Sequence, residues 1–211
     1  FVKFRLPMQF DAAIAEPQTP AARMTARQWG ILGALLGVAA VLAVTSLWQD
    51  SITYDETSHL TAGYSNLVTG DYRLAPDHPP LAKMWCAAPL LALGTKWLPP
   101  DAPAWRIGDP FFVGREYLFA LNNGPVLVLF GRCMMVVLML GLMATVFAIG
   151  RRLFGAHAAL AATALAALSP TLLAHGRLVT TDVPVTLCIS LSILLFARVL
   201  ERVTWGRIVA A

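Results

Sequence analysis

Long apolar stretches alternate with polar segments along this chain of 211 residues. Four of the stretches are long enough to cross a hydrocarbon core of about 30 Å, which takes roughly 20 helical residues. They cover residues 29–48, 125–149, 156–174 and 183–200. No alternation of period two supports a barrel, and only helices or closed barrels satisfy backbone polar groups in lipid. The pattern therefore predicts an all-α polytopic membrane protein with about four transmembrane helices.

The polar segment between the first two spans, residues 49–124, is too long for a simple connection. Apolar residues recur in it at helical spacing over residues 56–70 and again over residues 79–94. Prolines interrupt residues 98–110, and residues 111–122 predict a short amphipathic helix that leads back to the membrane. We expect interfacial amphipathic helices here, lying on the membrane surface with apolar sides down.

Composition agrees with this class, since 57% of the residues are hydrophobic and 13% are charged. The segments 1–28, 150–155 and 201–211, together with Arg198, hold nine basic residues against three acidic ones. The rest of the chain holds seven basic and nine acidic residues. The positive-inside rule therefore places the N-terminus and residues 201–211 in the cytoplasm and the loop 49–124 on the outer side. The net charge of +4 reports topology and gives no support to nucleic-acid binding.

Two clusters of charged and polar residues stand in the outer loop. They read Tyr54-Asp55-Glu56 and Asp77-His78-Pro79-Pro80-Leu81-Ala82-Lys83. Moving such groups towards hydrocarbon costs several kcal/mol each, so a mostly apolar chain seldom gathers them at a bilayer surface without a use. The sequence predicts a functional site in this loop.

The string YDETSHLTAGYSNLVTGDYRLAPDHPPLAKM, which contains both clusters, resembles the first outer loop of GT-C glycosyltransferases. The closest likeness is to the protein O-mannosyltransferases and the bacterial family-39 enzymes, and HPPLAK is its most specific piece. GRRLFG at 150–155 and RLVTTDVPVTL at 177–187 extend the resemblance. It implies a multi-pass enzyme of a bacterial inner membrane. It also implies more spans than four, so that residues 201–211 would lead into a further part of the fold.

The resemblance further implies an inverting transfer of a sugar from a polyprenyl-phosphate carrier to a protein or lipid hydroxyl on the outer face. A departing phosphate is stable as an anion, so one carboxylate base and a few cations suffice for this reaction. By resemblance, Asp55 matches the base, Glu56 is its acidic neighbour, and Asp182 is a second acidic position. The groups expected to meet the donor phosphate are His78, Lys83 and Arg177.

Structural roles for these residues stay open beside the functional ones. Asp55 stands where a helix N-cap would, and Asp182 could cap the last span. His78 could be a solvated loop histidine, whereas Lys83 and Arg177 could be interfacial anchors. The family varies in its need for a divalent metal, and no ligand cluster in this sequence supports one. For the whole chain, the alternative is a truncated or repurposed GT-C-like chain that serves as a structural transmembrane subunit of a larger membrane complex.

Overall fold

The structure, a computed structural model, describes residues 23–48 and 50–211. Helices are the regular elements in this part of the chain. Residues 1–22 of the predicted cytoplasmic segment 1–28, and Gln49, lie outside it. Three helices are long and apolar enough to cross a membrane: α2 (Ala26–Ser46), α7 (Gly124–Ala167) and α9 (Asp182–Glu201). The predicted all-α membrane class is confirmed.

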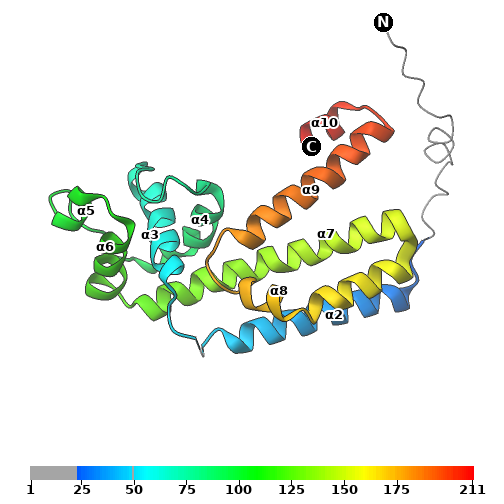
Figure 1. Ribbon diagram of the computed structural model, residues 1–211, viewed down its shortest axis with the longest axis horizontal. Coiled ribbons are helices and arrows are strands. Elements are labelled where there is room, and N and C mark those ends of the chain that lie inside the picture. The colour runs from blue at the N-terminus through cyan, green and yellow to red at the C-terminus, as the bar shows by residue number, and fades with distance from the viewer. Residues whose placement is uncertain (1–22, 49) are drawn as a thin grey trace, which may run out of the picture.

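Helix α7 is not one straight rod, because Gly155 interrupts it with φ 84° and ψ 178°. A Cβ atom on Gly150 would lie 3.1 Å from the Cα atom of Ala159. In a continuous helix, residues nine apart would be separated by roughly 13.5 Å. The chain therefore turns back at Gly155, as Figure 1 shows at the right-hand end of α7.

This reversal divides α7 at the place where the sequence predicts a turn between the second and third spans. The returning half ends at Ala167, and the short helix α8 (Pro170–His175) follows. Ser169 caps α8 by accepting a hydrogen bond from the N–H of Leu172. The predicted third span, 156–174, is therefore built from two helical pieces, and its crossing of the membrane stays a prediction. Beyond α9, a final short helix α10 covers Trp205–Ala210.

The outer loop folds into short helices gathered at one end of the long ones (Figure 1). They are α3 (Tyr54–Thr69), α4 (Pro80–Ala87), the 3₁₀ helix η1 (Ala88–Leu93), α5 (Pro103–Ile107), α6 (Pro110–Arg115) and the π-helix η2 (Glu116–Leu121). The expected helix ends are confirmed at Gly70 and Gly94, which adopt left-handed φ angles of 68° and 62°. The expectation that prolines keep 98–110 irregular is wrong in part, because Pro103 begins α5 as an N-terminal proline can.

The N-terminus of α3 also differs from the prediction. The cap is Thr53, whose hydroxyl accepts from the N–H of Glu56 while the Glu56 side chain accepts from the N–H of Thr53. This reciprocal pair is a capping box. Asp55 lies in the first turn of the helix and makes no cap bond, so the N-cap interpretation of Asp55 is wrong.

Helix α3 is enclosed by protein, since ten of its residues are buried, and α4 packs closely along it. Gly63 permits this approach, because a Cβ atom there would collide with the backbone carbonyl of Lys83. The segment α4–η1 exposes large apolar side chains, namely those of Leu81, Trp85, Leu91 and Leu93. This exposure suits the predicted contact of that segment with the membrane surface.

An aromatic cluster holds the rest of the loop against α3. The rings of Tyr64 and Tyr117 stack with centroids 5.0 Å apart, and Trp97 contacts both. Trp105 meets the edge of Trp97, and the Arg73 guanidinium lies 4.3 Å from the Trp105 ring centroid. Aromatic pairs of this kind contribute beyond their buried area, so the cluster fixes the loop that carries the candidate residues.

Candidate functional site

A buried ion pair between Glu56 and Arg132 lies where the outer helices meet the long ones. Arg132 belongs to the third turn of α7, and its Nε and Nη2 atoms lie 2.7 Å from Oε1 and Oε2 of Glu56. Both side chains are almost completely buried, with 4% and 0% exposed. This bidentate geometry is the strong form of the arginine–carboxylate contact.

The pair also binds two backbone segments that are far apart in the sequence. Arg132 donates to the carbonyl oxygens of Leu47, Asp50 and Ser51, which follow α2. Glu56 accepts from the N–H of Val179, in the connection before α9. Burial raises the pKa of Glu56, but the hydrogen bonds from Arg132, Thr53 and Val179 outweigh it and hold the pKa below its ordinary value. Glu56 is therefore an ionised anchor inside the protein.

Arg177 joins the same junction. Its guanidinium lies 2.5 Å from the Asp50 carboxylate and donates to the carbonyl oxygen of Ser46 at 2.8 Å. The side chain is 19% exposed. These contacts tie the connection before α9 to the end of α2, so the group expected at the donor phosphate is already engaged with protein.

Asp55 has the opposite environment to its neighbour Glu56. Its residue is exposed, and its carboxylate makes no hydrogen bond or ion pair with any residue in the described part of the chain. The two adjacent carboxylates thus differ in their bonding: Glu56 is held by protein contacts, whereas Asp55 is free to contact a ligand.

Two histidines lie together beside Asp55. His59 follows Asp55 by one turn of α3, and its ring centroid lies 4.8 Å from that of His78. His78 is half-exposed, and its Nδ1 atom lies 2.7 Å from the Asp77 carboxylate. His59 is buried, which lowers its pKa, as do the nearby charges of His78 and Lys83, whereas Asp55 raises it. The sequence interpretation missed His59, although its spacing of four residues from Asp55 was the available signal.

Lys83 faces the protein interior. The residue is 3% exposed, and its Nζ atom donates to the carbonyl oxygen of Ala75 at 2.6 Å. Burial lowers the pKa of Lys83, and the Asp77 carboxylate partly opposes this effect. Lys83 therefore supports the loop that carries His78, and an ammonium group retains two further donors after this bond.

Asp182 begins α9 and remains exposed. Its carboxylate lies 3.7 Å from Nδ1 of His175, at the end of α8. The connection between these two helices contains Val179, which contacts Glu56. Asp182 and Asp55 are therefore connected through this segment, although no direct bond joins their side chains.

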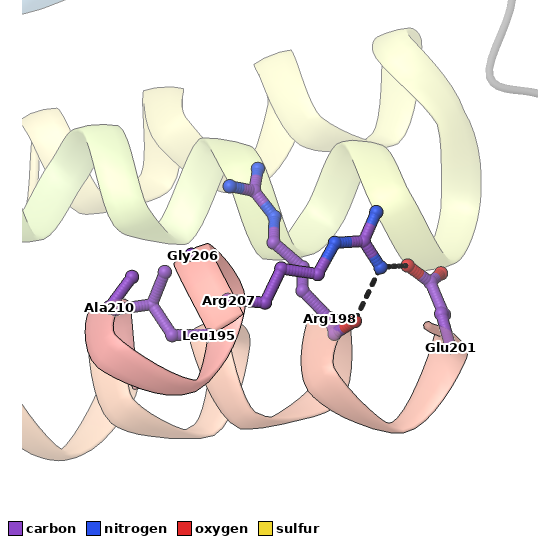
Figure 2. A pocket seen from close by; sticks show the side chains of 6 residues that line it. All are labelled: Leu195, Arg198, Glu201, Gly206, Arg207 and Ala210. Atoms are coloured by element: carbon purple, nitrogen blue, oxygen red, sulfur yellow. Dashed lines mark hydrogen bonds and ion pairs between the residues drawn. The ribbon is translucent and has the colours of Figure 1, made fainter. Parts of the chain in front are cut away.

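Two cavities of the described chain lie away from this cluster. One of about 240 Å³ separates α9 from α10, and Figure 2 shows Arg207 reaching Glu201 and the Arg198 backbone beside it. Another of about 580 Å³ is lined by α5, α6 and η2. Within residues 23–48 and 50–211, no three His, Cys, Asp or Glu side chains gather into a metal-binding group.

The helical spans and the acid–imidazole cluster at their end define a polytopic membrane protein with a candidate site outside its apolar region. A family model described as dolichyl-phosphate-mannose-protein mannosyltransferase matches residues 120–211. This match confirms the predicted resemblance to GT-C mannosyltransferases for that part of the chain. It includes Arg132, Arg177 and Asp182, whereas Asp55, Glu56, His78 and Lys83 precede it. Comparisons with curated proteins and with solved structures gave no match.

Proposed function

We propose that this protein is a membrane glycosyltransferase that moves a sugar from a polyprenyl-phosphate carrier to a hydroxyl group of a protein or lipid. The transfer takes place on the outer face of a bacterial inner membrane and inverts the anomeric centre. The family match to residues 120–211 supports the enzyme class. The observation that carries the choice of site is the contrast between exposed, unpaired Asp55 and buried, ion-paired Glu56.

In this mechanism Asp55 is the general base. Its carboxylate takes the proton of the acceptor hydroxyl as that oxygen attacks the anomeric carbon. The bond from the anomeric carbon to the phosphate oxygen breaks at the same time, and the phosphate leaves with the electron pair. A single displacement of this kind inverts the centre, and a positioned base contributes about 10²–10⁴-fold in rate.

Glu56 and Arg132 act as positioning residues. Their ion pair joins the start of α3 to α7, to the backbone after α2 and to Val179. Asp55 is the residue directly before Glu56, so its place depends on this junction. A carboxylate that is already bound by a guanidinium and two backbone N–H groups is a weak base, which is why we assign proton transfer to Asp55.

In this mechanism the departing phosphate lies next to the imidazole of His78. His78 is half-exposed beside Asp55's helix and can donate to a phosphate oxygen. Lys83 supports His78 through the Ala75 carbonyl and adds positive charge nearby. Arg177 acts at a distance by holding the segment before α9, and Asp182 borders the site as an exposed carboxylate.

A transfer assay on the full-length protein tests the role of Asp55. We expect Asp55→Asn to lower sugar transfer from a polyprenyl-phosphate donor in isolated membranes by about 10²–10⁴-fold, because the amide cannot accept the proton. Asp101→Asn is the matched control, since Asp101 is an exposed carboxylate elsewhere in the same loop. Unchanged turnover by the Asp55→Asn protein would remove Asp55 from the mechanism. A wild-type protein that inserts normally but never transfers sugar would favour the structural-subunit alternative.

A further inference from the structure

The mechanism above leaves His59 without a task, although its surroundings are unusual for a structural histidine. The residue is 7% exposed, and its Nδ1 atom has no hydrogen-bond partner among the described residues. Buried polar atoms in native proteins are nearly always bonded, so an unbonded one calls for an explanation. Here the ring lies against His78, a residue assigned to the donor phosphate.

The charges around the two imidazoles come from several elements. Helix α3 contributes Asp55, and Glu56 on the same helix is neutralised by Arg132 of α7. The loop before α4 contributes Asp77, which contacts His78, and α4 contributes Lys83. The segment before α9 contributes a backbone hydrogen bond between Val179 and His59, and Arg177, whose charge is paired with Asp50. Lys83 and the charge of His78 both oppose protonation of His59.

We propose that His59 and His78 together form a two-imidazole site for a phosphate group, and that phosphate binding brings one proton from solvent into this pair. The inference rests on the proposed function, because it gives the lipid-linked donor its binding partner. A phosphate oxygen that approaches the nitrogen-bearing edges of both rings can accept a hydrogen bond from each of them. Its negative charge favours the protonated state that burial and Lys83 disfavour in the free protein.

Proton uptake has a thermodynamic consequence. When a ligand binds the protonated form of a site more tightly, its affinity falls as the pH rises above the pKa of the free site. For one proton the limit is about tenfold per pH unit. The lowered pKa of His59 in the free protein places neutral pH in this range.

Calorimetry on the purified full-length protein measures both quantities. The probe is a farnesyl methyl phosphodiester, which has one negative charge that does not titrate near neutral pH, and farnesol is the uncharged control. Titrations at pH 7 in two buffers with different ionisation enthalpies give the number of protons taken up. We expect an uptake approaching one proton, an affinity that falls by up to about tenfold per pH unit from pH 7 to 9, and weaker binding of farnesol.

Variants then assign the proton to the pair. We expect His59→Gln to reduce both the proton uptake and the pH dependence, whereas His157→Gln, an exposed histidine on α7, should leave both unchanged. Wild-type binding without proton uptake, or an unchanged proton count in His59→Gln, would overturn the inference while leaving the proposed function intact. Failure of the diester to bind a protein that still transfers sugar would also overturn it. The proton uptake of the wild-type protein tests the inference even if His59→Gln does not fold.

Discussion

At the scale of single residues, neighbouring side chains with the same charge have different tasks. Glu56 points into the protein and is bonded at both carboxylate oxygens, whereas Asp55 points out and is unbonded. Helical geometry separates them, because consecutive residues on a helix face directions about 100° apart. The adjacent pair therefore supplies a fixed anchor and an unbonded carboxylate, which is the base in the proposed mechanism.

The buried anchor can be tested by removing its cation. Arg132→Gln should lower the free energy of unfolding by about 3–5 kcal/mol, because it leaves the Glu56 carboxylate buried without its ion-pair partner. Unfolding of the purified protein in a denaturing detergent titration measures the loss. Arg106→Gln is the control, since Arg106 is exposed on α5 and should change stability by less than about 1 kcal/mol. Equal effects of the two changes would show that the buried pair contributes little.

At the scale of elements, the outer loop depends on the close packing of α3 against α4. Cys86, on the inner side of α4, is buried, and burial raises the pKa of its thiol to about 12. Lys83 on the same helix reaches back to the Ala75 carbonyl. Helix α4 thus orders the loop that holds His78 beside His59.

Gly63 provides the test of this packing. Gly63→Ala should destabilise the protein by about 1–3 kcal/mol and reduce sugar transfer, because the added methyl group collides with the Lys83 carbonyl and separates α4 from α3. Thermal unfolding and the transfer assay measure the two effects. In Gly33→Ala, the new methyl group meets no atom within 4 Å, so this control should be neutral or slightly stabilising. A Gly63→Ala protein as stable and active as the wild type would contradict the packing argument.

At the scale of the whole molecule, the candidate site lies at the end of the long helices opposite the turn at Gly155 (Figure 1). The turn carries Arg151 and Arg152, and Arg152 pairs with Glu201 at the end of α9 at 2.7 Å. The positive-inside rule places such arginines in the cytoplasm. The charge pattern therefore predicts that the acid–imidazole cluster lies on the outer side.

Cysteine accessibility tests this topology. In a full-length protein whose native cysteines are replaced by serine, Asp101→Cys should react with a membrane-impermeant maleimide in right-side-out vesicles. His157→Cys, next to the turn, should react only after the vesicles are opened, because one span separates it from the outer loop. Both positions are exposed in the protein, so accessibility reports the side of the membrane. Labelling of His157→Cys in sealed vesicles would contradict the proposed orientation.

Parts of the site were accessible to sequence reasoning and parts were not. The clusters around Asp55 and His78 were found, because charged groups are conspicuous in an apolar chain. The task of Glu56 was not, since only the fold brings Arg132 to it from 76 positions away. His59 was missed because its spacing of four residues from Asp55 is a weak signal, which many helices contain. Thr53, and not Asp55, is the N-cap of α3. Both residues have side chains that can cap a helix, and the exact first residue of a helix cannot be read from the sequence.

The sequence by itself determined the membrane class, the helical content, the positions of the long apolar helices and the GT-C relationship. These follow from local quantities: hydropathy over about 20 residues, helical spacing and short motifs. Only the tertiary structure decided which polar groups are free to react. Burial and pairing convert Glu56, Lys83 and Arg177 into groups engaged with protein and leave Asp55 exposed. These differences arise from contacts between segments distant in the chain, which local patterns do not record.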